Sequence, residues 1–190
     1  MKTIEFIKED LKKNLKKSRY EHSLRVADTA KKLAKIYGVD KDKAYLAGLI
    51  HDSAKYNRDP FELAEEFNFK LSQNLIESPQ LIHCYLAPLK VKRDYKINDE
   101  EILEAIKSHT TGKINMSPLD KIIFIADYIE PGRDFEGVCE ARRLSEEDLN
   151  LACLYKFDST IKFLIKEKKV IDLETIKARN NLLEKLWLNF

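Results

Sequence analysis

Residues 44–52 read AYLAGLIHD and residues 122–127 read IIFIAD, and these two stretches decide the fold. Each is apolar nearly all round a helix, which predicts two central helices in a helical protein. Each run then ends in acid, at His51-Asp52 and at Asp127. A carboxylate that follows a buried apolar run is costly unless a partner compensates it. Such a conflict between local pattern and burial indicates a functional site.

The rest of the chain carries helix start and stop signals, and period-two alternation is not sustained anywhere. Capping side chains and prolines mark the predicted starts, and glycine or proline follows several predicted ends. We therefore expect an all-α fold, a helical bundle of nine or ten helices in a single domain over residues 1–190, with a short stretch near Tyr95 as the best strand candidate. The predicted helices begin at Ser18 with Glu21 (to Tyr37), Asp40 (to about Lys55), Asp59-Pro60, Ser78-Pro79, Asn98 with Glu101 (to about His109), Ser117-Pro118 (to Pro131), Ser145 with Asp148 (to about Lys168) and Asp172.

Composition excludes several classes of protein. The chain has 190 residues, 44% hydrophobic and 35% charged, which suits one globular domain and excludes a disordered chain. Its 34 basic and 32 acidic residues give a net charge of +2, so no global field attracts nucleic acid. The first 37 residues hold 11 basic and 5 acidic residues, which we interpret as a solvated helix face that can also steer a polyphosphate.

The location expected from the sequence is cytoplasmic. Cys84, Cys139 and Cys153 are odd in number and scattered, which is typical of reduced thiols and not of a disulfide framework. The N-terminus lacks an apolar signal core, and no apolar run approaches the ~20 residues that span a bilayer. We expect no membrane partner and no nucleic-acid partner.

All four histidines lie on or beside an apolar face of a predicted helix, so each is expected to point inward. Taken singly, each is also compatible with a hydrogen-bonded core residue, and Asp127 with a salt-bridged core acid. Together they favour a metal cage of imidazoles and carboxylates, a donor set that suits iron, zinc, manganese or cobalt and not calcium. The candidate ligands are His22, His51, Asp52, His83, His109 and Asp127.

The adjacent pair His51-Asp52 has a chemical logic. A carboxylate has two oxygens and can bridge two ions, whereas an imidazole cannot. Two cations a few ångströms apart would turn a bridging water into hydroxide and hold both ends of an in-line phosphoryl displacement. A single ion near the helix end could also take both side chains, so the pattern is compatible with one ion or with two.

Three longer segments carry a resemblance to a known family. They are HDSAK (51–55), SHTTGKINMSPLDKIIFIADYIEPGR (108–133) and FEGVCEARRLSEEDLNLA (135–152). They resemble the YqeK family of the HD-domain superfamily, whose H…HD…D pattern falls here on His22, His51-Asp52 and Asp127. That family comprises bacterial symmetrical bis(5'-nucleosyl)-tetraphosphatases, which cleave diadenosine tetraphosphate into two ADP. The resemblance runs from Tyr20 to about Leu164.

The resemblance implies an all-α HD fold that holds two transition-metal ions, with iron as the expected element. It places His22, His51, Asp52 and Asp127 on the first ion, with Asp52 bridging. His83 and His109 would bind the second ion or the substrate phosphates. The chain departs from the family pattern at Ser53 and around His83, where Cys84, Tyr85 and Pro88 replace expected small residues.

Further residues are candidates for contacts with a nucleotide. Lys55 and Arg133 are expected to neutralise phosphates, with a solvated lysine and a surface arginine as the alternatives. Thr110 and Thr111 precede Gly112 in a loop that can contact phosphate or simply end the helix. Arg19 lies three residues before His22, and the rings of Tyr20 and Tyr128 can stack on adenine or belong to the core. The predicted catalytic residues are His51, Asp52 and Lys55, and the predicted substrate-binding residues are Arg19, Lys55, His83, His109, Thr110, Thr111, Tyr128 and Arg133.

The function expected from the sequence is therefore hydrolysis of diadenosine tetraphosphate to two ADP. Symmetric cleavage requires a pocket that anchors one ADP moiety and spans two phosphates, and the sequence does not show that pocket. The alternatives are an HD phosphohydrolase acting on a dNTP, mononucleotide or cyclic nucleotide, and a non-catalytic nucleotide-binding module. The oligomeric state is left open, with a homodimer as one option.

Overall fold

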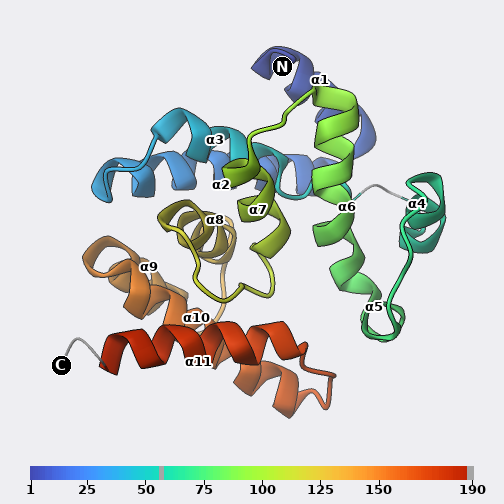
Figure 1. Ribbon diagram of the computed structural model, residues 1–190. Coiled ribbons are helices and arrows are strands. Elements are labelled where there is room, and N and C mark those ends of the chain that lie inside the picture. The colour runs from blue at the N-terminus through green and yellow to red at the C-terminus, as the bar shows by residue number, and fades with distance from the viewer. Residues whose placement is uncertain (56–57, 188–190) are drawn as a thin grey trace.

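The computed structural model describes residues 1–55 and 58–187, and within them the fold is all-helical, as predicted (Figure 1). No described residue lies in a β-strand, and none of the described helices is long and apolar enough to cross a membrane. Eleven α-helices occur in these residues, and ten of them have seven residues or more. They are α1 (Ile4–Asn14), α2 (Lys17–Ile36), α3 (Lys41–Ile50), α4 (Pro60–Glu66), α5 (Gln73–Glu77), α6 (Ile82–Lys90), α7 (Glu100–Ser108), α8 (Pro118–Ile129), α9 (Val138–Glu147), α10 (Leu149–Lys166) and α11 (Leu173–Trp187).

Helix α8 lies at the centre of the molecule, with α2, α3, α7 and α10 packed around it (Figure 1). Its residues are buried almost all round, as the apolar run predicts. Ser117 and Asp120 form a complete capping box at its start, and Pro131 follows its C-cap. Helix α10 packs on α8 through the rings of Phe124 and Phe157, whose centroids lie 4.6 Å apart. The termini of these central helices therefore meet in the interior.

Helices α2 and α3 approach each other closely because Gly48 has no side chain. A Cβ atom at position 48 would lie 2.9 Å from the Cα atom of Ala27. The apolar run at residues 44–50 forms α3, capped by Asp40 as predicted, but the helix ends at Ile50 and not near Lys55. His51 and Asp52 therefore stand at the end of a helix that is pressed against α2.

Several predicted boundaries are wrong for local reasons. Helix α2 begins at Lys17 with no side-chain cap, so Ser18 lies inside it. Asp99, not Asn98, caps α7. Ser145 lies inside α9 and donates to the carbonyl of Arg142, so that Asp148 alone caps α10. In each case a neighbouring residue holds the cap position, and spacing alone does not separate the two.

Two other local predictions need correction. Ser78 makes no capping bond, and Pro79 opens a 3₁₀ turn (Pro79–Leu81) that leads into α6. The strand candidate near Tyr95 is a π-helical turn (Val91–Tyr95) that continues α6, and Tyr95 is fully buried. By contrast, Asp59-Pro60 and Asp172 start their helices as predicted.

Candidate metal centre and phosphate site

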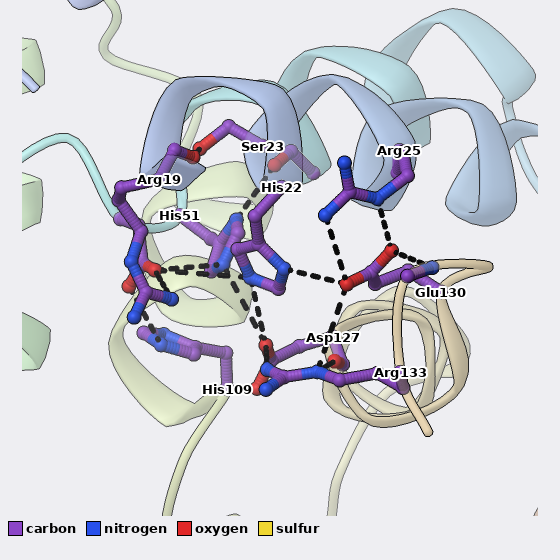
Figure 2. A network of polar contacts seen from close by, with 12 residues as sticks. Arg19, His22, Ser23, Arg25, His51, His109, Asp127, Glu130 and Arg133 are labelled. Carbon is purple, nitrogen blue, oxygen red and sulfur yellow. Dashed lines mark hydrogen bonds and ion pairs between the residues drawn. The ribbon is translucent and has the colours of Figure 1, made fainter. Parts of the chain in front are cut away.

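The structure brings all six predicted ligands together at the inner ends of five helices. His22 comes from α2, His51 and Asp52 from the end of α3, His83 from α6, His109 from the end of α7 and Asp127 from α8. The ring centroids of His22 and His51 lie 5.3 Å apart, those of His51 and His109 4.9 Å apart, and those of His83 and His109 5.1 Å apart. Figure 2 shows three of these imidazoles and Asp127 converging on one volume.

The four imidazoles are held in one tautomer. His51, His83 and His109 each direct Nδ1 at the carbonyl oxygen three residues earlier, at 2.7, 2.7 and 2.6 Å. A carbonyl only accepts, so each Nδ1 must carry the proton. His22 Nδ1 lies 3.1 Å from Glu130 Oε1, a carboxylate that also accepts. In every neutral ring the Nε2 lone pair therefore faces the cluster.

These lone pairs lack proton donors. His83 Nε2 and His109 Nε2 lie only 3.1 Å apart. Burial lowers the pKa of both imidazoles, and that of His83 well below its ordinary value, so neither ring carries a second proton at neutral pH. His22 Nε2, His51 Nε2 and Asp52 Oδ1 are buried without a hydrogen-bond partner. Facing acceptors are unfavourable alone and suit a cation between them, so the donor set fits a metal.

The two oxygens of Asp52 face different pairs of histidines. Oδ2 lies 3.4 Å from His51 Nε2 and 3.9 Å from His22 Nε2. Oδ1 lies 3.3 Å from His83 Nε2 and 3.6 Å from His109 Nε2. Asp127 Oδ1 joins the first pair, 3.1 Å from His22 Nε2 and 3.9 Å from His51 Nε2. The cluster thus divides into two donor sets that share one carboxylate.

Three cationic side chains hold the two carboxylates. Arg19 donates to Asp52 Oδ2 at 2.9 Å, and Lys55 Nζ lies 3.2 Å from Asp52 Oδ1. Arg133 donates to Asp127 Oδ1 at 2.8 Å (Figure 2). Burial opposes ionisation of Asp52, but His51 and Lys55 outweigh it and hold the pKa of Asp52 well below its usual range. Burial is likewise outweighed at Asp127, whose pKa is lowered by His22 and Lys156.

Two cavities flank the cluster and share no lining residue. One, of about 370 Å³, is lined by the four cations Lys16, Arg19, Lys55 and Arg58 and reaches the cluster at His83. We call it the basic cavity. The other, of about 650 Å³, reaches the cluster at Asp127 and Arg133. The cluster therefore has one cavity on the side of His83 and another on the side of Asp127.

The remaining candidates for substrate binding do not all lie at the two cavities. Tyr128 lines the larger cavity, whereas Tyr20 is half-buried against the core. Thr110 lies near His83 through Cys84, whose thiol donates to Thr110 Oγ1 at 3.2 Å. The Thr111 hydroxyl donates to the Gly112 carbonyl and lines neither cavity. For Thr111 the structure favours the helix-ending alternative, because Gly112 has a φ of +68° and its Cα faces Phe157 too closely for a side chain.

The sequence analysis missed three residues at the site. Glu130 accepts from His22 and from Arg25 Nε at 2.5 Å, so it orients a candidate ligand. Lys156 is buried, donates to the carbonyls of His109 and Phe124, and lies 3.9 Å from Asp127 Oδ2. Burial lowers the pKa of Lys156 to about 8.

The third missed residue, Cys84, has Sγ 3.4 Å from His83 Nε2. Burial raises the pKa of this thiol to about 12, so it stays protonated beside the cluster. Signals for two of the three exist in the sequence. Glu130 follows Asp127 by one helical turn, and Lys156 interrupts an apolar stripe on α10.

Comparison with known proteins agrees with this geometry. The model of the HD-domain family matches residues 19–132, which include every candidate ligand. A protein of Halalkalibacterium halodurans, named symmetrical bis(5'-nucleosyl)-tetraphosphatase, is 43% identical over 175 residues, 91% of this chain and 93% of the relative. A protein of the same name from Bacillus subtilis is 38% identical over 173 residues, 90% of this chain and 92% of the relative.

A solved structure has the same fold. The crystal structure from Clostridium acetobutylicum, described as that of a predicted HD superfamily hydrolase involved in NAD metabolism, superposes with a TM-score of 0.92. It is 45% identical in sequence, and the match covers 97% of this chain and 99% of that one. The helical arrangement around the cluster is therefore shared along almost the entire chain.

Proposed function

The chain belongs to the HD-domain family, and we propose that it is a symmetrical bis(5'-nucleosyl)-tetraphosphatase that hydrolyses diadenosine tetraphosphate to two ADP. The observation that carries the proposal is the division of the cluster by Asp52, whose two oxygens face two separate pairs of imidazoles. Two ions held a few ångströms apart suit the central anhydride of a polyphosphate.

We propose two metal positions with named ligands. His22, His51, Asp127 and Asp52 Oδ2 would hold the first ion, and His83, His109 and Asp52 Oδ1 the second. Bound ions there supply an acidified water and screen the charge of phosphoryl oxygens. Iron as the native element and two as the number of ions are part of the proposal, supported by the mixed nitrogen and oxygen donors.

The chain's own cations are proposed to bind the phosphates. Arg19 and Lys55 are about one third exposed at the basic cavity, and Arg133 stands at the other cavity. Each now neutralises a carboxylate, so each is positioned to turn towards a phosphate when ions occupy the carboxylates. ADP is already a good leaving group, so no strong general acid is required of these residues.

The side chains behind the ligands are proposed to keep them fixed. Glu130 holds His22 in the tautomer that directs Nε2 inward, as outer carboxylates do at metal sites. Lys156 braces the end of α7 against α8 through two carbonyls. We also propose that the chain acts as one domain, and that it is cytoplasmic, as its three free cysteines suggest.

Product analysis tests the function directly. Protein purified without chelator is assayed for its metal content and incubated with diadenosine tetraphosphate, and the nucleotides are separated by chromatography. We expect ADP as the sole product and no turnover by Asp52→Asn. ATP with AMP would contradict symmetric cleavage. Release of inorganic phosphate or of a nucleoside monophosphate from other nucleotides, with diadenosine tetraphosphate untouched, would indicate a different HD hydrolase.

A further inference from the structure

The larger of the two cavities has an aromatic wall. It lies between the end of α8, the segment after it and the outer half of α10, and has a volume of about 650 Å³. We call it the aromatic groove, defined by Tyr128, Phe135 and Phe163. The basic cavity, among the described residues, has no phenylalanine, tyrosine or tryptophan in its lining. The described linings of the two cavities therefore differ in chemistry.

The rings of the aromatic groove are available for stacking. Tyr128 and Phe135 already pack together, with centroids 4.8 Å apart. Ser159 of α10 lines the groove together with these two rings. Phe163 is 52% exposed, and Lys169 Nζ lies over its ring, 5.2 Å from the centroid. A large exposed ring in the wall of a cavity suits a planar ligand, because any nucleobase has a face that stacks on it.

Charge continues from this groove to the cluster. Asp127 and Arg133 line the groove at one end and belong to the cluster. Lys162 and Lys166 line it from α10, and Glu136 adds one carboxylate from the segment after α8. A ligand with an aromatic part and an adjoining chain of phosphates matches this order of side chains. A purely apolar partner would leave three cations facing it and matches the groove less well.

We propose that the aromatic groove binds the base and ribose of one nucleotide half of the substrate, whose two phosphates extend past Arg133 to the cluster. The inference rests on the proposed function and supplies the anchoring pocket that symmetric cleavage requires. A base fixed in the groove would place the bond beyond its second phosphate over the metal ligands. The basic cavity then takes phosphates of the other half, with no base-specific contact needed there.

Binding measurements with Phe163→Ala test this assignment. The probes are ADP and inorganic pyrophosphate, titrated by calorimetry into the metal-loaded protein. We expect the Kd for ADP to rise roughly tenfold, because alanine removes a stacking partner. The Kd for pyrophosphate should stay within about twofold, because pyrophosphate has no base. For diadenosine tetraphosphate, KM should rise while kcat changes little.

Matched variants separate stacking from structural damage. Phe163→Tyr keeps the ring and should restore the wild-type Kd for ADP. Phe6→Ala removes a ring that is 46% exposed on α1 and lines neither cavity, so it should change nothing. An unchanged Kd for ADP in Phe163→Ala, or equal losses for ADP and pyrophosphate, would overturn the proposal. A change from dimer to monomer with ADP affinity retained would overturn it too, by making the groove an interface.

The two proposals fail separately. If the wild type does not cleave diadenosine tetraphosphate but ADP binding still depends on Phe163, the groove assignment stands and the proposed function is wrong. If diadenosine tetraphosphate is cleaved to ADP with the same KM by Phe163→Ala and the wild type, the function stands and the groove assignment is wrong.

Discussion

Helix α6 carries a buried polar side chain near each end, and the two are in opposite states. Lys90 in the last turn is fully buried, with Nζ 3.2 Å from Asp10 Oδ2, 3.0 Å from Asp94 Oδ2 and 3.3 Å from the Tyr95 hydroxyl. His83 in the first turn directs Nε2 at another acceptor, His109 Nε2. The fold therefore provides hydrogen-bond partners for the Lys90 ammonium, whereas the Nε2 lone pair of His83 faces the lone pair of His109 Nε2.

This difference separates stability from function. A buried charge whose partners are all provided by the chain contributes to folding and needs nothing more. Buried imidazole nitrogens that face one another without a proton between them cost stability, and the fold retains them where an external ion completes them. We therefore expect a substitution of Lys90 to lower stability and leave activity unchanged. A substitution in the His83–His109 pair should raise stability and lower activity.

The largest effect is expected from His109→Leu. The leucine has a similar volume and removes one of the two facing lone pairs, so the chelated protein should become more stable by about 1 kcal/mol. Activity should fall by roughly a thousandfold, because one donor set loses half of its imidazoles. Urea unfolding in chelator and turnover with added metal measure the two effects. Loss of stability together with activity would show that His109 is a structural residue.

Metal binding gives this variant a second readout. An ion that binds only the folded protein raises the unfolding temperature. The wild type should show this rise on titration with Fe²⁺ or Mn²⁺, and His109→Leu should show a smaller one. An equal rise in both proteins would place the ion elsewhere.

The same contrast between buried groups with and without partners shows how much of the site the sequence predicts. The apolar runs that end in His51-Asp52 and Asp127 are local conflicts, visible without a fold. The pairing of His83 with His109 is expected only from the family resemblance, because it depends on how α6 meets α7 and spacing alone does not show it. Lys90 and Lys156 look alike in sequence, a lysine among apolar residues, yet carboxylates surround one and backbone carbonyls the other. Residue type and spacing predict which groups are buried, and only the fold decides what satisfies them.

Prediction of the fold from the sequence has a similar limit. The helix start at Ser117-Pro118 is predicted correctly because its signals are local. The aromatic groove is not predicted, because it needs the segment after α8 to lie against α10, more than twenty residues along the chain. Gly48 is one signal that we did not use: a glycine inside a strong helix indicates a close helix contact, here with Ala27.

The next effect in size is expected from Lys90→Met. The change removes the cation that Asp10 and Asp94 share, although both are more than a quarter exposed and Arg93 still pairs with Asp94 at 2.6 Å. Stability should fall by about 2 to 4 kcal/mol, and turnover by the folded protein should not change. Lys92→Met is the matched control, since Lys92 is 42% exposed, pairs with Glu100, and should lose less than about 0.5 kcal/mol. A large loss of turnover by folded Lys90→Met would break the comparison.

The smallest effect is expected from a substitution of Glu130. Its carboxylate has hydrogen-bond partners within the chain, as the Lys90 ammonium has, yet it also orients the candidate ligand His22. Burial opposes its ionisation, but hydrogen bonds from Arg25, His22 and the Gly132 N–H outweigh it and lower the pKa to about 2. The folded pKa lies below the unfolded value of 4.5, so the stabilisation is present above about pH 4.5 and is lost as the pH falls towards 2. In chelator at pH 7, Glu130→Gln should therefore be less stable by about 1 to 3 kcal/mol.

The pH profile of Glu130→Gln tests whether Glu130 only stabilises the fold, as Lys90 does, or also orients the candidate ligand His22. Asp52 and Asp127, whose pKa values are also lowered in the folded state, likewise take up protons as the pH falls, so only the difference between the wild-type and Glu130→Gln unfolding curves reports on Glu130. That difference should shrink between pH 5 and pH 2. If Glu130 also orients His22, metal affinity at pH 7 should fall by roughly ten- to a hundredfold. A variant that loses stability but binds metal as the wild type does would place Glu130 with Lys90, as part of the fold and not of the site.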